Sequence, residues 1–255
     1  MAVQAVAVAA AILEAVAQHG PVGVSQISRM TGTPKATAQR MLVTWNELGW
    51  IRKETTQPIT WSLTSRMLQL GSAHDPVVEL KAIARPELER LSEELGGETV
   101  HLAVQSSTNT CLIDRVEGTK SVRTHYPIGG TSPLYATATG NAMLSRMSEA
   151  EVQRLIAHSG MHPVTAHTVQ TIDALRTVLE TGRRQGYFTV EGTNHAETSA
   201  ISAPIPRSDG GAAGAISISL PTFRVTPDLA ATYGAAVRDT ANNVAVLLEQ
   251  AHKYQ

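Results

Sequence analysis

The chain has 255 residues, enough for one or two domains, and a net charge of −1. The charge is unevenly spread: residues 1–74 contain six Lys or Arg and three acidic residues, so they carry +3 and the remainder carries −4. A basic N-terminal segment on an acidic body is typical of a nucleic-acid-binding head joined to a domain with a different partner.

Cysteine usage and hydropathy exclude two further classes of protein. Cys111 is the only cysteine, which excludes an intramolecular disulfide framework and predicts a cytoplasmic location. Its strand-like surroundings predict a small buried apolar residue rather than a reactive thiol. No apolar run reaches the roughly 18 residues of a membrane-spanning helix, so no membrane partner is expected.

The first predicted helix occupies the N-terminus and ends at Gly20-Pro21. Glu14 interrupts this apolar segment and no basic region precedes it, so it does not resemble a signal peptide. Its apolar face recurs at helical spacing and consists of Ala5, Val8, Ala9, Ile12 and Val16. We expect it to be the first helix of an N-terminal domain, with an Ala-rich surface suited to a second subunit.

Residues 24–50 predict a helix-turn-helix. Ser25 is suited to cap a first helix that carries Ile27 and Met30 inward, and Gly32 supplies the turn. Thr33-Pro34 predicts the start of a second helix, with Thr as N-cap and Pro at the first helical position. The apolar stripe of this second helix consists of Ala38, Met41, Leu42, Trp45 and Leu48.

The polar side of the second helix carries cationic and amide groups that suit phosphates and base edges in a major groove. Two short strands around residues 55–58 then predict a β-hairpin with a basic tip, which favours a winged helix-turn-helix over two ordinary amphipathic helices with a solvated face. The residues expected to contact DNA are Ser25, Lys35, Ala36, Thr37, Gln39, Arg40, Thr44, Arg52, Lys53 and Thr56.

The rest of the chain predicts a linker helix and an α+β domain. Asp75-Pro76 would begin the linker helix and Pro86 would bend it. We expect a DNA-binding domain over residues 1–72, the linker over 73–96 and a second domain over 97–255. The expected strands of this domain cover residues 99–104, 110–116, 121–124, 187–191, 201–205 and 213–220. Expected helices cover 135–147, a segment capped by Ser148, 172–185 ending at Gly186, and a last one from Pro227. This order favours a mainly antiparallel sheet.

Seven segments carry a family resemblance, in this order: ISRMTGTPKATAQRMLVTWNELGWI, RPELERLSEELGGETVHLAV, IDRVEGTKSVRTH, PIGGTSPLYATATGNAML, RRQGYFT, ISAPI and GAISIS. Over nearly its whole length the chain resembles the IclR family of bacterial transcription regulators. The resemblance implies a winged helix-turn-helix domain that binds double-stranded operator DNA, a linker helix, and a GAF/profilin-like domain that binds a small-molecule effector. It also implies a homodimer, often paired into a homotetramer, that acts as a repressor or an activator, without enzymatic activity or a cofactor.

The resemblance further implies where the effector binds. The matching positions are Ser121, Thr124, Ser132, Leu134, Ala138, Thr139, Val190, Ala200, Ser217 and Ser219. Val190 and Ala200 stand where relatives that take small keto-acids carry Asp and Cys. The loss of these polar groups argues against a two- or three-carbon keto-acid and favours a larger effector, such as an aromatic acid or its amide-like derivative. The alternative is that these small residues simply allow close packing.

Motifs for other chemistry are missing from the sequence. There is no GxSxG, GxxxxGK[ST] or HExxH pattern. His158 and His162 are separated by Gly160, so a metal site there is not expected. His101, His125 and His195 are interpreted as ligand neighbours or surface residues. An enzyme with an inherited N-terminal module and a protein-interaction adaptor remain the alternatives to a regulator.

Overall fold

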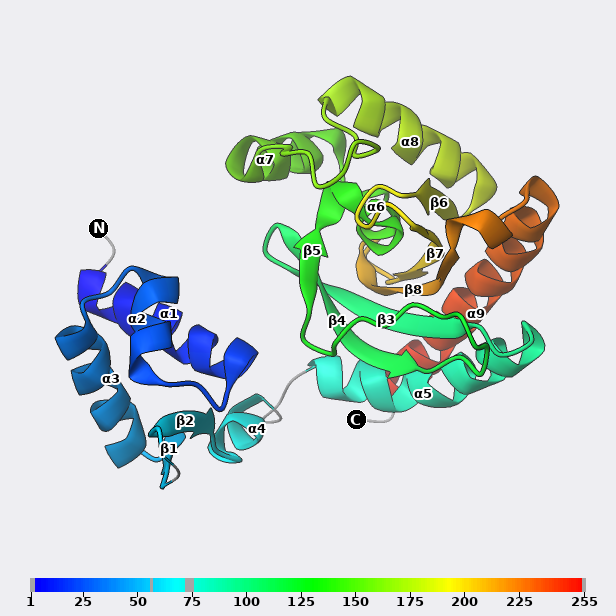
Figure 1. Cartoon of the computed structure of the whole chain (residues 1–255). Coiled ribbons are helices and arrows are strands. Elements are labelled where there is room, and N and C mark those ends of the chain that lie inside the picture. Colours follow the sequence, from blue (N-terminus) through cyan, green and yellow to red (C-terminus); the bar gives the residue numbers. More distant parts are fainter. Residues whose placement is uncertain (1–2, 56, 72–75, 254–255) are drawn as a thin grey trace. The chain divides into compact units, whose positions relative to one another are not determined.

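The computed structural model describes residues 3–55, 57–71 and 76–253. The chain divides into two compact units, Met1–Asp75 and Pro76–Gln255, and each is described by itself (Figure 1). Within the described ranges, no helix has both the length and the apolar character that crossing a bilayer requires. Thr56, expected to contact DNA, and Asp75, expected to begin the linker helix, lie outside the described residues.

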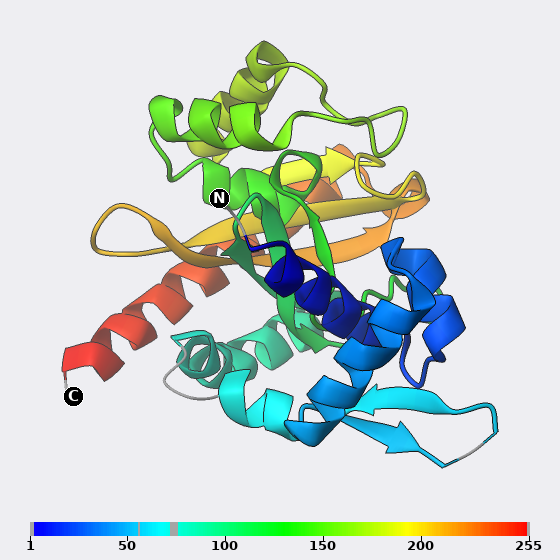
Figure 2. The same cartoon turned by 90° about the vertical axis from the view of Figure 1, so that its left-hand side faces the viewer.

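The first unit is a three-helix core with a β-hairpin, as expected for a winged helix-turn-helix. Its elements are α1 (Gln4–His19), α2 (Val24–Thr31), α3 (Lys35–Glu47), β1 (Ile51–Glu54), β2 (Thr60–Leu63) and α4 (Arg66–Gly71). The strands β1 and β2 pair antiparallel, and Val22 adds a bridge to Trp61 on the outer side of β2. The apolar faces of the three helices meet Ile51 and Trp61 in one core. Figure 2 shows the cyan hairpin beside the blue helix α3.

Four local expectations for this unit were wrong. Helix α2 begins at Val24 after Gly23, and no side chain caps it, so Ser25 is an exposed residue of its first turn. Helix α3 begins at Lys35, one residue later than expected, with Pro34 at the N-cap. Met30 and Leu48 are 40% and 52% exposed. Both lie at the end of a helix, where the chain turns away from the core through a glycine with positive φ.

The second unit is built on one six-stranded antiparallel sheet in the order β5-β4-β3-β8-β7-β6. Its strands are β3 (Thr99–Ser106), β4 (Asn109–Val116), β5 (Thr131–Pro133), β6 (Phe188–Glu191), β7 (Thr198–Pro206) and β8 (Ala212–Pro221). Its helices are α5 (Pro76–Glu94), η1 (Leu134–Ala136), α6 (Ala138–Leu144), α7 (Glu149–Ser159), α8 (Ile172–Gln185), η2 (Thr222–Arg224) and α9 (Pro227–Lys253). The α+β class and the antiparallel sheet are confirmed.

The two faces of this sheet have different partners because side chains alternate along each strand. Val100, Leu102, Ile216 and Ile218 pack against α5 and α9, which cover one face (Figure 1). The residues between them, among them His101 and Ser217, point to the other face. Helix α6 and the loops around it lie over that second face, where the candidate site is found.

A β-bulge in β4 changes this alternation at one point. Ala103 pairs with Leu112, whereas the preceding residue, Leu102, pairs with Asp114, so Ile113 is an extra residue. Strict alternation would place Leu112 and Asp114 on the same face. With the bulge, Leu112 faces the second face, and Asp114 is buried against α5, where it accepts a hydrogen bond from Arg85.

Several expectations for this unit were right and three were wrong. Ser148 caps α7 in a capping box with Glu151, and Gly186 ends α8 with a φ of 80°. Residues 121–124 form no strand, and Cys111 is half-buried rather than buried. The helix expected over residues 135–147 is split into η1 and α6. A Cβ on Gly140 would lie 1.9 Å from the carbonyl oxygen of Leu134, so this tight junction requires glycine.

Candidate functional site

The first unit exposes a polar face on α3. Lys35, Ala36, Gln39, Arg40 and Thr44 are exposed, and Thr37 is half-buried. The hydroxyl of Thr44 donates to the carbonyl of Arg40. The face is therefore open to a partner and offers one amide and two cationic side chains, the groups that contact base edges and phosphates.

The hairpin places its two cations differently. Arg52 is 66% exposed, but its Nε lies 2.9 Å from Glu54 Oε1, so its charge is partly neutralised. The hydroxyl of Ser62 donates to the same carboxylate, and these two hydrogen bonds lower the pKa of Glu54. Lys53 is exposed, and among the described residues its ammonium has no acidic partner; only its backbone amide is bound, to Asn46. Lys53 is thus the better placed cation for a phosphate.

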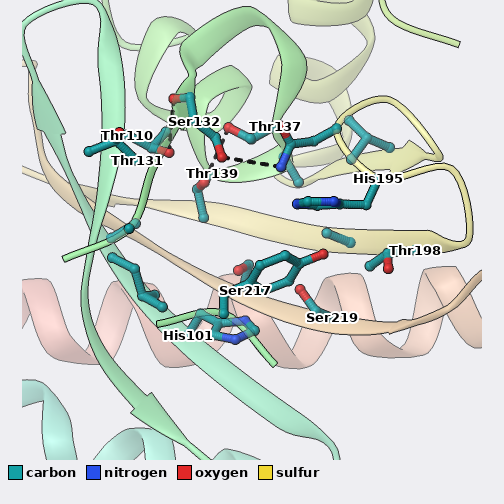
Figure 3. A pocket seen from close by; sticks show the side chains of 18 of the residues that line it. His101, Thr110, Thr131, Ser132, Thr137, Thr139, His195, Thr198, Ser217 and Ser219 are labelled. Carbon is teal, nitrogen blue, oxygen red and sulfur yellow. Dashed lines mark hydrogen bonds between the residues drawn. The ribbon is translucent and has the colours of Figure 1, made fainter. Parts of the chain in front are cut away.

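The second unit contains a cavity of about 290 Å³ between the open face of the sheet and α6. The floor is formed by alternate strand residues: His101, Ala103, Ala200, Val190, Ser217 and Ser219. The opposite side is formed by the segment that leads into α6, with Ser132, Thr137, Ala138 and Thr139. Figure 3 shows Ser132, Thr137 and Thr139 on one side of the cavity and His101, Ser217 and Ser219 on the other.

Hydrogen bonds fix the loop that closes one end of the cavity. Asn194 Nδ2 donates to Ser132 Oγ at 3.2 Å, and the Thr193 hydroxyl donates to the carbonyl of Ala136 at 2.6 Å. The Thr168 hydroxyl donates to the carbonyl of Thr193 at 2.7 Å. These bonds tie residues 193–194 to β5 and η1, so the end wall of the cavity is held in place before a ligand binds.

His101 is the most unusual residue of the cavity. It is 3% exposed, and its Nε2 has no hydrogen-bond partner among the described residues. Burial, with a smaller contribution from the nearby Arg115 charge, lowers the pKa of His101 to about 3, so the imidazole is neutral at physiological pH. The ring of Tyr126 lies 5.6 Å from that of His101 and 4.9 Å from that of His195. Burial also raises the pKa of Tyr126.

The structure brings seven of the ten predicted effector positions to this cavity and leaves three outside its lining. Ser132, Ala138, Thr139, Val190, Ala200, Ser217 and Ser219 line it. Thr124 lies beside the cavity, where its hydroxyl donates to the carbonyl of Ser219 at 3.4 Å. Ser121 is exposed and is not part of the lining. Leu134 is wholly buried in the apolar cluster under α7 and α8, so it has no surface to offer a ligand.

Other lining residues were missed by sequence reasoning. Thr110 and Leu112 are spaced two apart on β4, and their alternation with the core positions could have indicated them. Tyr126, Asn194 and Thr198 are carried by loops or a strand end, where periodicity gives no information. His101 and His195, interpreted from the sequence as ligand neighbours or surface residues, both line the cavity.

Comparisons with known proteins agree with both units. A profile of the IclR helix-turn-helix domain matches residues 5–55, and a profile of the bacterial transcriptional regulator IclR C-terminal domain matches residues 76–246. The transcriptional repressor IclR of Escherichia coli is 32% identical over 236 residues, which cover 91% of this chain and 85% of that protein. The repressor AllR of E. coli is 30% identical over 230 residues, with 90% and 84% coverage.

A solved structure shows the same fold. An IclR homolog from Microbacterium hydrocarbonoxydans, described as complexed with 4-hydroxybenzoate, has a TM-score of 0.81 and 22% identity, and covers 97% of this chain and 100% of its own. The curated relatives are named as transcriptional repressors or regulators, and not as enzymes. The resemblance found in the sequence is thereby confirmed, and the chain belongs to the IclR family of bacterial transcriptional regulators.

Proposed function

We propose that this protein is a repressor that binds operator DNA through α3 and the hairpin, and that it responds to a small organic effector in the cavity of the second unit. The effector is an aromatic acid or its derivative. The observation that carries this proposal is the cavity, which has a volume of about 290 Å³ and is lined by hydroxyl groups on two facing sides.

The size of the cavity supports an effector larger than a small keto-acid. Its volume of about 290 Å³ is close to the lower end of the range of small-molecule pockets, about 300–1,000 Å³. A two- or three-carbon keto-acid would leave much of this space unfilled. Val190 and Ala200 supply apolar surface where relatives that take small keto-acids carry polar groups. A ring-sized ligand fills the space and buries more apolar area.

Binding of the effector is tested by thermal-shift screening of the full-length chain with aromatic acids, their amides and small keto-acids. A ligand from the larger class should raise the unfolding temperature of the second unit, because it binds the native state alone. Stabilisation by glyoxylate or pyruvate, with none by any larger ligand, would contradict the proposed effector class.

DNA binding is tested by gel shifts with the promoter region of the protein's own gene and with random fragments, over a range of salt concentrations. Affinity should fall steeply with salt because phosphate contacts release counterions. Arg40→Ala should lose about 1–3 kcal/mol for the operator if Arg40 contacts a base. Arg154→Ala is the matched control, since Arg154 is an exposed arginine on α7 of the other unit. Equal affinity for operator and random DNA at every salt concentration would refute the proposal.

We also propose the domain limits and self-association that the family resemblance implies. Residues 1–72 form the DNA-binding domain, 73–96 the linker and 97–255 the effector domain; the structure groups α5 with the second unit, against whose sheet it packs. Val3 and Val6 are each 66% exposed at the start of α1, and this apolar surface supports a dimer. Sedimentation of the wild type and of Val6→Asp tests this, because a monomeric wild type would exclude it.

A further inference from the structure

One side of the cavity is closed by a segment that belongs to no helix or strand. Residues 120–128, the strap, lie between β4 and β5 and contribute Tyr126 and Pro127 to the lining. The ring of Tyr126 lies 5.6 Å from the ring of His101, on the floor, and 4.9 Å from the ring of His195, which follows the end-wall residues. The strap therefore fills the space between the floor of the cavity and its end wall.

Both ends of the strap are fixed to the sheet. At its start, the Lys120 ammonium lies 2.6 Å from Oε1 of Glu98, whose side chain is 2% exposed. Just after its end, the amide of Gly129 donates to the carbonyl of Leu112 at 2.7 Å. Gly129 has a φ of 84°, a conformation that favours glycine. These two fixed points can act as hinges for the residues between them.

The middle of the strap is held by side chains rather than by its backbone ladder. Residues 121–126 make no backbone-to-backbone hydrogen bond with any residue that the structure describes. The Thr124 hydroxyl donates to the carbonyl of Ser219 at 3.4 Å, which is long for a hydrogen bond between oxygens. The hydroxyl of Tyr126 has a hydrogen bond with Thr198. Two hydroxyl groups therefore fasten this part of the strap to β7 and β8.

The strap also buries little surface. The structure describes all of residues 120–130, and none of them is buried; Val122 and Ile128 are 58% and 56% exposed. From beneath, the guanidinium of Arg115 donates to the carbonyl of Tyr126. A segment with few buried contacts and few backbone hydrogen bonds opens at a low cost in free energy. The end wall, which is tied by hydrogen bonds of 2.6 and 2.7 Å, is held more firmly.

We propose that the strap is a gate: residues 121–126 move away from the sheet, release the hydrogen bonds of Thr124 and Tyr126, and open a path from solvent to the cavity. The Lys120–Glu98 pair and Gly129 are the hinges. This inference extends the proposed function, because the gate is the route by which an effector reaches the cavity. Its test needs neither an effector nor DNA, so a failure of the gate would leave the proposed function standing.

The gate is tested by the reactivity of a thiol placed inside the cavity. Thr139 points from the start of α6 into the cavity (Figure 3), and Thr139→Cys is combined with Cys111→Ala, which removes the only native thiol. Alkylation by iodoacetamide is followed by mass spectrometry of the intact full-length protein. In this background, Thr124→Val and Tyr126→Phe each remove one hydrogen bond of the strap and should raise the alkylation rate about three- to tenfold. An unchanged rate in the variant with both substitutions would overturn the proposal, because the cavity is then reached by another route.

Two controls separate local opening from a general loosening of the fold. Thr177→Val is the matched control for Thr124→Val, because the Thr177 hydroxyl donates to the carbonyl of Asp173 on the exposed side of α8; it should change the rate by less than about twofold. Ala84→Cys, again with Cys111→Ala, places the thiol in the apolar core, where Ala84 is 0% exposed, so this thiol reacts through unfolding. Its rate should not respond to Thr124→Val. An equal rise at both thiols would overturn the proposal, since unfolding rather than a gate would then expose the cavity.

Discussion

Substitution of Arg85 tests how firmly the linker helix is fixed to the sheet of the second unit. The Arg85 guanidinium donates to Asp114 Oδ1 at 3.2 Å and to the carbonyl of Arg115 at 3.1 Å, and its Nε binds Glu89 at 2.6 Å. The side chain of Asp114 is 3% exposed, and its Oδ2 has no partner among the described residues. In Arg85→Ala, the Asp114 carboxylate would keep two contacts: a hydrogen bond from the backbone amide of Arg115, and the Lys81 ammonium, whose Nζ is 3.9 Å away.

The burial of Asp114 sets the expected size of the effect. Arg85 is 43% exposed, so solvent screens its own charge, and the cost falls mainly on the carboxylate left behind. Removing one partner of a buried, charged hydrogen bond costs about 1.5–3 kcal/mol, and the two remaining contacts favour the lower part of this range. We therefore expect Arg85→Ala to reduce the free energy of unfolding of the second unit by about 2 kcal/mol.

Arg176→Ala is the matched control for this measurement. Arg176 is 40% exposed and also binds two carboxylates, but its partners Glu149 and Asp173 are 62% and 82% exposed. Such surface pairs contribute less than about 1 kcal/mol. The two variants therefore differ mainly in the burial of the acid that loses its partner.

Thermal unfolding of the full-length chain provides the assay. All three tryptophans, Trp45, Trp50 and Trp61, lie in the first unit, so their fluorescence reports on that unit alone, whereas far-UV circular dichroism reports on both. Arg85→Ala should lower the midpoint seen by circular dichroism by roughly 4–8 °C and leave the fluorescence transition unchanged. The reasoning fails if Arg85→Ala and Arg176→Ala lower that midpoint equally.

Three further predictions concern the second unit. Gly140→Ala should destabilise it by more than about 3 kcal/mol in a urea titration, because the new Cβ would meet the Leu134 carbonyl, and a cost below about 0.5 kcal/mol would contradict this close approach. Ser148→Ala should cost about 1 kcal/mol through loss of the capping box, and a cost near zero would contradict the observed cap. His101 should make stability depend on pH: its folded pKa of about 3 lies below the ordinary 6.5, so stability present above pH 6.5 is lost as pH falls towards 3. The free energy of unfolding should fall by about 2 kcal/mol between pH 7 and pH 5 in the wild type and by less in His101→Gln. Urea titrations at the two pH values check this, and an equal fall in both proteins would refute it.

Local signals in the sequence predicted much of this fold. Ser148 with Glu151 three residues later, and Gly186 after an amphipathic run, act within one helical turn, so they predicted a helix start and a helix end. The alternation in residues 213–220 likewise predicted β8 and the shared face of Ser217 and Ser219. These features depend on neighbouring residues only, which is why a single sequence reveals them.

The errors arise where tertiary contacts decide the structure. Residues 121–124 were expected to form a strand, but β5, formed by Thr131–Pro133, occupies the edge of the sheet beside β4. The extra residue Ile113 has no sequence signal, although it turns Asp114 towards α5. The loop residues Tyr126 and Asn194 reach the cavity through contacts with distant segments. Leu134 was expected at the cavity on the basis of resemblance, and packing under α7 and α8 removes it from there.

The alternation of side chains along the central strands affects how the ligand specificity of such a regulator can change. On β3 and β8, every second residue packs against α5 and α9, and the residues between them line the cavity. Under the proposed function, exchanging His101 or Ser219 for another side chain would alter the preferred effector while Leu102 and Ile218 keep their packing. A new ligand specificity can therefore arise by substitutions that leave the packing between the sheet and the long helices unchanged.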